Sequence, residues 1–181
     1  MDASSGSLLS RAVGAALLNV DTYEAVEADR SATGQAGLLV LLVAVSGAAA
    51  EYLQGSGGMV AAVFNAFAGW LIWAGVTNLV GTRVFGGTAD WGELLRTLGF
   101  AQAPGVLGVL AVAPILGGSI SFVVAIWTLV AGIVAIRQAL DVSTGKAVLT
   151  ALVSMALVIA AAIAFAVVVG VGAGIGSALR S

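Results

Sequence analysis

Long apolar stretches alternate along the chain with shorter segments that carry the charged residues. The apolar stretches cover approximately residues 36–52, 58–80, 98–116, 119–136 and 147–172. Each has the length of a membrane-spanning helix, which needs roughly 17 to 25 mostly apolar residues. The pattern therefore predicts an all-α fold, a polytopic membrane helix bundle with about five transmembrane helices.

Two features predict local departures from regular helices. Pro104 and Pro114 fall in the third stretch, and each removes a backbone donor and can kink a helix, so this span is expected to be the least regular. The Gly-rich segment 54–58 predicts a tight hairpin between the first and second spans.

The N-terminal segment predicts a helix that lies along the membrane surface. Its apolar residues share one stripe at helical spacing: Leu9, Val13, Ala16, Leu17 and Val20. Arg11 lies off this stripe. The stripe could pack against the bundle or face lipid, and the sequence leaves both readings open.

Two further segments have the spacing of a helix-starting capping box, in which a side chain and a backbone N–H exchange hydrogen bonds three residues apart. Asp21 and Glu24 predict a short helix over 22–30. Asp90 and Glu93 predict a second interfacial helix that leads into the third span, with Trp91 at headgroup depth.

The basic residues fall in alternate gaps between the spans. Six of the seven occupy the segments before the first span, between the second and third, and between the fourth and fifth: Arg11, Arg30, Arg83, Arg96, Arg137 and Lys146. Basic loops stay cytoplasmic, so we expect a cytoplasmic N-terminus, an external C-terminus and insertion in the cell membrane.

Composition narrows the function classes. The chain is 60% hydrophobic and 9% charged, with no His and no Cys, which excludes disulfides, thiolate chemistry and imidazole sites. Lys and Arg are too few for a nucleic-acid interface. The predicted spans contain no ionisable residue, so no proton relay is expected. We expect no enzymatic activity and no cofactor.

Small residues recur four apart near the C-terminus, and this spacing lets helix backbones approach closely. The glycine pairs are Gly170 with Gly174 and Gly172 with Gly176, and the alanine series is Ala156, Ala160 and Ala164. They could pack within the bundle or form a homo-oligomer, and the sequence does not separate the two.

The chain resembles the prokaryotic branch of the Yip family, the Ypt/Rab-interacting membrane proteins. The resemblance covers about residues 18–168 and rests on segments 22–24, 28–36, 86–87, 94–104, 137–143 and 146–147, with Pro114 and Trp127. It implies a five-span protein with a cytoplasmic N-terminus and no catalytic residue. Eukaryotic relatives are associated with prenylated small GTPases and membrane traffic.

The chain also departs from those relatives. Phe100 and Ala101 stand where they often have Tyr and a small hydroxyl residue, and the region before the first span is shorter. The expected organisation is a cytoplasmic segment with an interfacial helix over 1–35, a five-helix Yip-like transmembrane domain over 36–176, and a short external tail over 177–181.

The favoured hypothesis is a non-enzymatic membrane organiser that binds lipid or a protein partner through its cytoplasmic face. The candidate residues are Tyr23, Glu24, Glu27, Asp29, Arg83, Trp91, Arg96, Arg137 and Lys146. Glu24, Glu27 and Asp29 form an acidic group that could bind a cation or a basic partner, or form a solvated face.

The alternative is a small-solute transporter or channel. Its polar site would lie at the Pro-broken third span, because irregular backbone at membrane depth usually lines a cavity or is buried in protein. The candidate residues are Asn65, Asn78, Gln102 and Pro104. Hydrogen bonding between helices would explain the same polar side chains.

Overall fold

The computed structural model describes residues 6–53, 58–113 and 115–178, and within these ranges every regular element is helical. The elements are α1 (Leu8–Ala16), α2 (Val20–Ala28), α3 (Ala32–Leu53), α4 (Met59–Arg83), α5 (Trp91–Ala101), the 3-10 helix η2 (Ala103–Val112), α6 (Gly117–Leu140) and α7 (Thr144–Ala178).

Five helical segments are long and apolar enough to cross a membrane: α3, α4, α5 continued by η2, α6, and α7 as far as Val169. The prediction of an all-α bundle with five spans is confirmed. Several helices extend beyond the apolar stretch, as α4 does to Arg83, because the hydrogen-bonded backbone continues where the side chains become polar. Most of the predicted hairpin at 54–58, and Pro114, lie outside the described residues.

The third span is irregular, as predicted. Its α-helical half ends at Ala101, and a 3-10 helix follows with Pro104 in its first turn. Proline has no N–H to continue the α-helical ladder, and the chain tightens instead, with the Gln102 N–H donating to the Gly99 carbonyl at 3.2 Å.

The capping box at the start of this span is confirmed. The Glu93 N–H donates to Asp90 Oδ1 at 2.7 Å, and the Asp90 N–H donates to Glu93 Oε2 at 2.8 Å. The helix differs from the predicted surface helix in one respect, because every residue from Leu94 to Ala101 is buried. It is the first half of the third span, and Trp91 is half exposed at its beginning.

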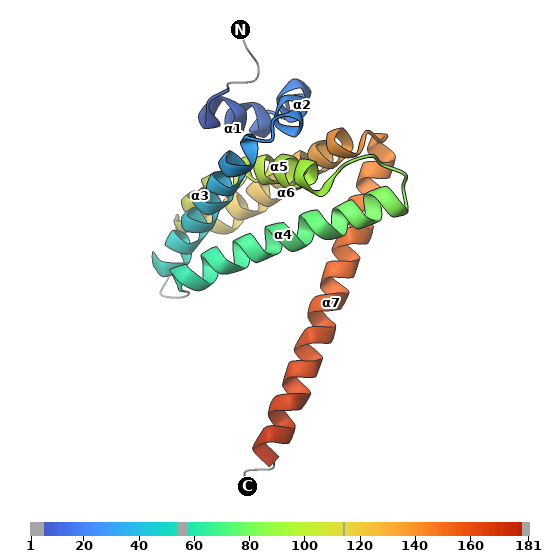
Figure 1. Cartoon of the computed structure of the whole chain (residues 1–181). Helices are drawn as coiled ribbons and strands as arrows, with labels where there is room; N and C mark the ends of the chain where they lie inside the picture. The colour runs from blue at the N-terminus through green and yellow to red at the C-terminus, as the bar shows by residue number, and fades with distance from the viewer. Residues whose placement is uncertain (1–5, 54–57, 114, 179–181) are drawn as a thin grey trace.

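Helices α1 and α2 lie side by side over one end of the bundle, on α5 and α6 (Figure 1). We call this pair the cap. The predicted capping box of Asp21 with Glu24 is wrong: Asn19 is the N-cap of α2, and its Oδ1 accepts from the Thr22 N–H at 3.1 Å. Asn19 already supplies the acceptor that the first turn needs, so Asp21 lies inside that turn.

At the centre of the bundle, a glycine of α5 packs closely against both α3 and α4. A Cβ atom at Gly99 of α5 would lie 2.7 Å from the Cβ of Ala36 in α3 and 3.1 Å from the ring of Trp70 in α4. The Trp70 Nε1–H donates to the Leu95 carbonyl at 3.0 Å. Three spans therefore meet at backbone distance, which only glycine permits at this position.

Helix α7 is packed over its first part only. Ala147, Thr150, Ala151 and Ser154 are buried against the bundle, whereas the side chains from Met155 to Val169 are exposed or nearly so. The helix runs away from the other spans (Figure 1). The series Ala156, Ala160 and Ala164 is exposed, and the surroundings of the glycines from 170 to 176 lie outside what the structure describes.

Candidate functional site

A buried arginine of the third span holds the cap to the bundle. Arg96 is only 5% exposed. Its Nε donates to the carbonyls of Val26 and Glu27, each at 3.2 Å, and its Nη2 donates to the Glu27 carbonyl. These carbonyls belong to the last turn of α2, where backbone acceptors lack helical partners and the helix dipole is negative. The Arg96 guanidinium thus donates hydrogen bonds to the last backbone carbonyls of α2, and these carbonyls rather than a carboxylate are its acceptors.

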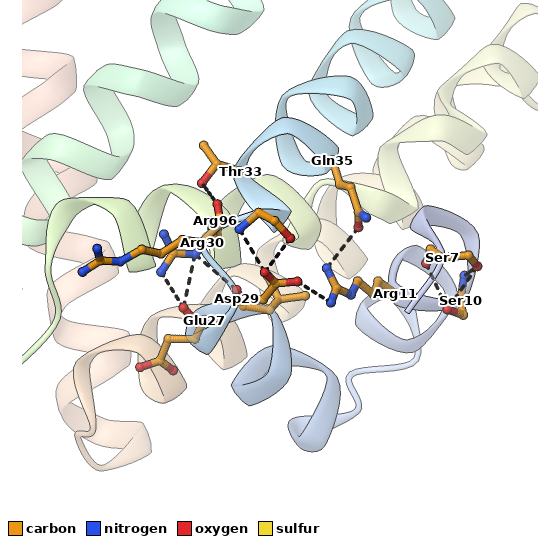
Figure 2. Close-up of polar contacts among 11 residues, drawn as sticks. Ser7, Ser10, Arg11, Glu27, Asp29, Arg30, Thr33, Gln35 and Arg96 are labelled. Atoms are coloured by element: carbon orange, nitrogen blue, oxygen red, sulfur yellow. Dashed lines mark hydrogen bonds and ion pairs between the residues drawn. The ribbon is translucent and has the colours of Figure 1, made fainter. Parts of the chain in front are cut away.

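A second arginine joins α1 to the segment that links α2 with α3. Arg11 Nη2 lies 2.7 Å from Asp29 Oδ2, and Arg11 Nη1 donates to Gln35 Oε1 at 3.2 Å (Figure 2). Asp29 Oδ1 also accepts from the N–H and the hydroxyl of Ser31. The Ser31 hydroxyl and then the Arg11 guanidinium hold the pKa of Asp29 down to about 2, so Asp29 is ionised at neutral pH.

Two aromatic side chains complete the attachment of α1. The Tyr23 hydroxyl, fully buried, donates to the Ala15 carbonyl at 3.1 Å, and burial raises the Tyr23 pKa. The Trp127 Nε1–H of α6 donates to the Ala16 carbonyl at 2.7 Å. The last turn of α1 therefore has donors from both α2 and α6.

The acidic side of the cap faces α5 and α6. Gln138 Nε2 donates to Glu24 Oε1 at 3.0 Å. Glu27 is partly buried, and its pKa is raised to about 7, first by desolvation and then by the charges of Glu93, Asp141 and Glu24, with Arg96 opposing. Within the part of the chain that the structure describes, no three acidic side chains are arranged to hold a metal ion.

The segment 84–90 is tied to the same end of the bundle. Lys146 Nζ donates to the Phe85 carbonyl at 3.0 Å, and the Thr88 hydroxyl donates to Asp141 Oδ2 at 3.2 Å. Next to these contacts, Arg137, Gln138 and the residues of the α6–α7 turn, 141–144, line an open polar pocket of about 470 Å³. The cap, this segment and the α6–α7 turn make one surface, which we call the polar end.

The structure divides the nine predicted binding residues into two groups. Tyr23, Asp29 and Arg96 hold the cap in place and offer little surface to a partner. The side chains with accessible surface at the polar end are Glu24, Glu27, Arg83, Trp91, Arg137 and Lys146. Sequence reasoning did not identify Arg11, Trp127 and Gln138 as holders of the cap, because their partners are 18 to 114 residues away.

Helix α1 presents its apolar stripe outward. Leu9 is 73% exposed and Leu17 is 71% exposed, with Val13 between them at 49%. Arg11 and Ala15 are the residues buried against the bundle. Of the two readings that the sequence left open, the structure matches the one in which the stripe faces away from the bundle.

The four residues of the transport alternative do not come together. Asn65 is exposed on α4, and Asn78 lies 13 residues further along the same helix, about 20 Å away along the axis. Asn78 Nδ2 donates to the Ala89 carbonyl at 2.8 Å. Gln102 lines a separate cavity, and Pro104 is buried.

Replacing Arg96 by Met should release the cap. The carbonyls of Val26 and Glu27 would lose a charged donor, and hydrogen bonds to charged groups contribute about 1.5 to 3 kcal/mol. The chain has no Cys, so Val26→Cys gives a single buried thiol. We expect maleimide to label this thiol severalfold faster with Arg96→Met. The matched control is Arg83→Met, an exposed arginine, which should leave the rate unchanged; equal rates in both would contradict the assignment.

Stability should fall as pH rises through the Glu27 titration. The folded-state pKa of Glu27 is raised to about 7 from an ordinary value of 4.5. The folded state binds the Glu27 proton more tightly than the unfolded state does. The stabilisation of the fold that this proton provides is therefore fully present below about pH 4.5 and is lost as pH rises to about 7. We expect the thermal midpoint in detergent to decline between pH 5 and 7, and to decline less in Glu27→Gln. Parallel profiles for the two proteins would refute this role.

Residues 16–169 match the family model of the Yip1 domain. The matched range includes α2 and the five candidate spans, so Arg96 and its α2 carbonyl partners lie within it. No curated protein and no solved structure matches the chain.

Proposed function

This chain belongs to the Yip1 domain family and is an integral membrane protein, and from that premise we propose that it is a non-enzymatic membrane organiser working through its polar end. In this proposal the polar end faces the cytoplasm, as the placement of the basic residues favours. Its cap lies at headgroup depth in the cell membrane and contacts lipid, and its accessible charged side chains bind anionic headgroups or a protein partner.

The observation that carries the proposal is the outward apolar edge of α1. This segment buries Arg11 and exposes Leu9, Val13 and Leu17, whereas a helix surrounded by water would expose the arginine and bury the apolar side chains. The same arrangement suits the boundary between headgroups and acyl chains, where an apolar edge can enter by about 5–10 Å. Trp91, half exposed at the start of α5, is a residue type that prefers this depth.

The accessible bases support a preference for anionic lipid. Arg83 and Lys146 are exposed, and Arg137 is partly exposed beside the polar pocket. Each base near an anionic surface contributes about 1 kcal/mol to attraction. Glu24 and Glu27 lie at the same end, with Gln138 hydrogen-bonded to both Arg137 and Glu24, and a basic protein segment would find complementary charge at these two acids.

A fluorophore on α1 tests the insertion. Since the chain has no Cys, Val13→Cys can be labelled uniquely with an environment-sensitive dye, and Asp21→Cys on α2 serves as the exposed polar control. In reconstituted vesicles we expect blue-shifted emission at position 13, quenched by lipids with brominated chains. Position 21 should emit as in water. If both positions report water, α1 does not engage the bilayer and the proposal fails.

Spin-labelled lipids test the headgroup preference. In vesicles of mixed phosphatidylglycerol and phosphatidylcholine, we expect the protein to enrich labelled phosphatidylglycerol at its boundary. Changing Arg83, Arg137 and Lys146 to Gln should reduce that enrichment severalfold, since three attractions of about 1 kcal/mol are removed. Labelled phosphatidylcholine, which carries no net charge, is the control and should not respond. Unchanged enrichment in the triple variant would rule out these residues as the headgroup contacts.

A further inference from the structure

A separate cavity lies among the apolar helices, distinct from the polar pocket at Arg137. It is partly enclosed, has a volume of about 220 Å³ and is bounded by α4, α5, α6 and α7. Trp73, Gln102, Thr128, Gly132 and Ala151 are among its lining residues, and none of the lining residues is charged. The cavity reaches the point where the third span changes from α-helix to 3-10 helix.

The cavity contains hydrogen-bonding groups that the protein does not use. Neither the side-chain amide of Gln102 nor the hydroxyl of Thr128 forms a hydrogen bond with another residue in the part of the chain that the structure describes. An amide or hydroxyl without a partner in an apolar medium is strongly unfavourable. A bound group that offers a neutral oxygen would satisfy both.

The hydrocarbon phase has access to this cavity. Ala151 of α7 forms part of the wall, and the side chains of α7 become exposed from Met155 onward, where the helix leaves the bundle (Figure 1). Leu129 of α6 lines the cavity and is also 44% exposed on the outer surface. A lipid chain can therefore enter sideways between α6 and the packed part of α7.

The size of the cavity restricts the occupant. Pockets that enclose a whole drug-sized molecule have volumes of about 300–1,000 Å³. A cavity of about 220 Å³ holds a segment of a larger molecule whose remainder stays outside. An apolar wall with one neutral polar patch excludes a charged solute, because nothing in the lining would neutralise it.

We propose that this cavity binds one membrane glycerolipid, with part of a hydrocarbon chain against α6 and a neutral oxygen of the lipid at Gln102 and Thr128. Gln102 is here a lipid ligand, a role different from the transport site considered from the sequence. The proposal uses no residue of the cap or of the polar end, so it can stand or fall independently of the proposed function.

Gly132 provides a way to fill the cavity without disturbing its wall. A Cβ atom built there meets nothing within 4 Å, so Gly132→Leu should occupy the space intended for the lipid. Gly47 of α3 is the matched control, because its Cβ also meets nothing within 4 Å, it is partly exposed like Gly132, and no residue of α3 lines the cavity. Both replacements exchange a helical glycine for the same side chain.

The experiment uses the full chain in phosphatidylcholine vesicles that contain a phosphatidylcholine with a diazirine on its acyl chain. After irradiation, mass spectrometry locates the modified residues, and modification of the cavity lining is divided by modification at Phe165, which is exposed on α7. We expect strong labelling of the lining in the parent and in Gly47→Leu, and a loss of about fivefold or more in Gly132→Leu.

A second variant separates chain binding from the polar contact. Gln102→Leu keeps the apolar wall and removes the amide, so labelling should fall about fivefold, as expected when one hydrogen bond is lost. Size-exclusion profiles and helical circular dichroism identify any variant that fails to fold. Lining labelled far less than Phe165, which bulk lipid reaches, would mean that no lipid chain enters the cavity, and equal labelling in Gly132→Leu would mean that lipid binds elsewhere. Either result overturns the proposal.

Discussion

The contact between Arg96 and the last carbonyls of α2 is the interaction on which the polar end depends. Burying a guanidinium is unfavourable unless opposite charge and hydrogen-bond acceptors compensate its positive charge. Here the compensating charge is the negative end of a helix dipole. The carbonyls of Val26 and Glu27 are equally costly to bury without donors. Each group therefore stabilises the other, and the contact fixes α2 on α5 as the support on which α1 is then held by Arg11, Tyr23 and Trp127.

The basic residues at this end of the bundle are of two kinds. Arg11 and Arg96 are buried, whereas Arg83, Arg137 and Lys146 keep accessible surface at the same end of the bundle. All five count equally in a rule that orients a chain by its bases, since that rule considers position along the sequence. Burial decides which of them remain able to meet a headgroup or a partner.

The sequence predicts the spans well, because the thickness of the hydrocarbon imposes a length on each apolar stretch. It also predicts the capping box at Asp90 and the disturbance at Pro104, which are local effects. The cap is less predictable. The acids at 21 and 24 match a capping box and hide the N-cap at Asn19, and the contacts of Arg11 with Asp29 and of Trp127 with Ala16 join positions that no local pattern connects. The outward turn of the α1 stripe follows from those distant contacts.

The length of helix α7 makes its orientation sensitive to the thickness of the membrane. Its described apolar part begins at Ala147, after the charged Lys146, and reaches Val169; these 23 residues are about 35 Å long, against a hydrocarbon core of about 30 Å. A helix that exceeds the core relieves the mismatch by tilting or by thickening the bilayer around it. Since only the first part of α7 is packed, its outer part can bend relative to the bundle while the contacts of that first part are kept. A thinner membrane therefore favours a more tilted α7, and a thicker one a more upright α7.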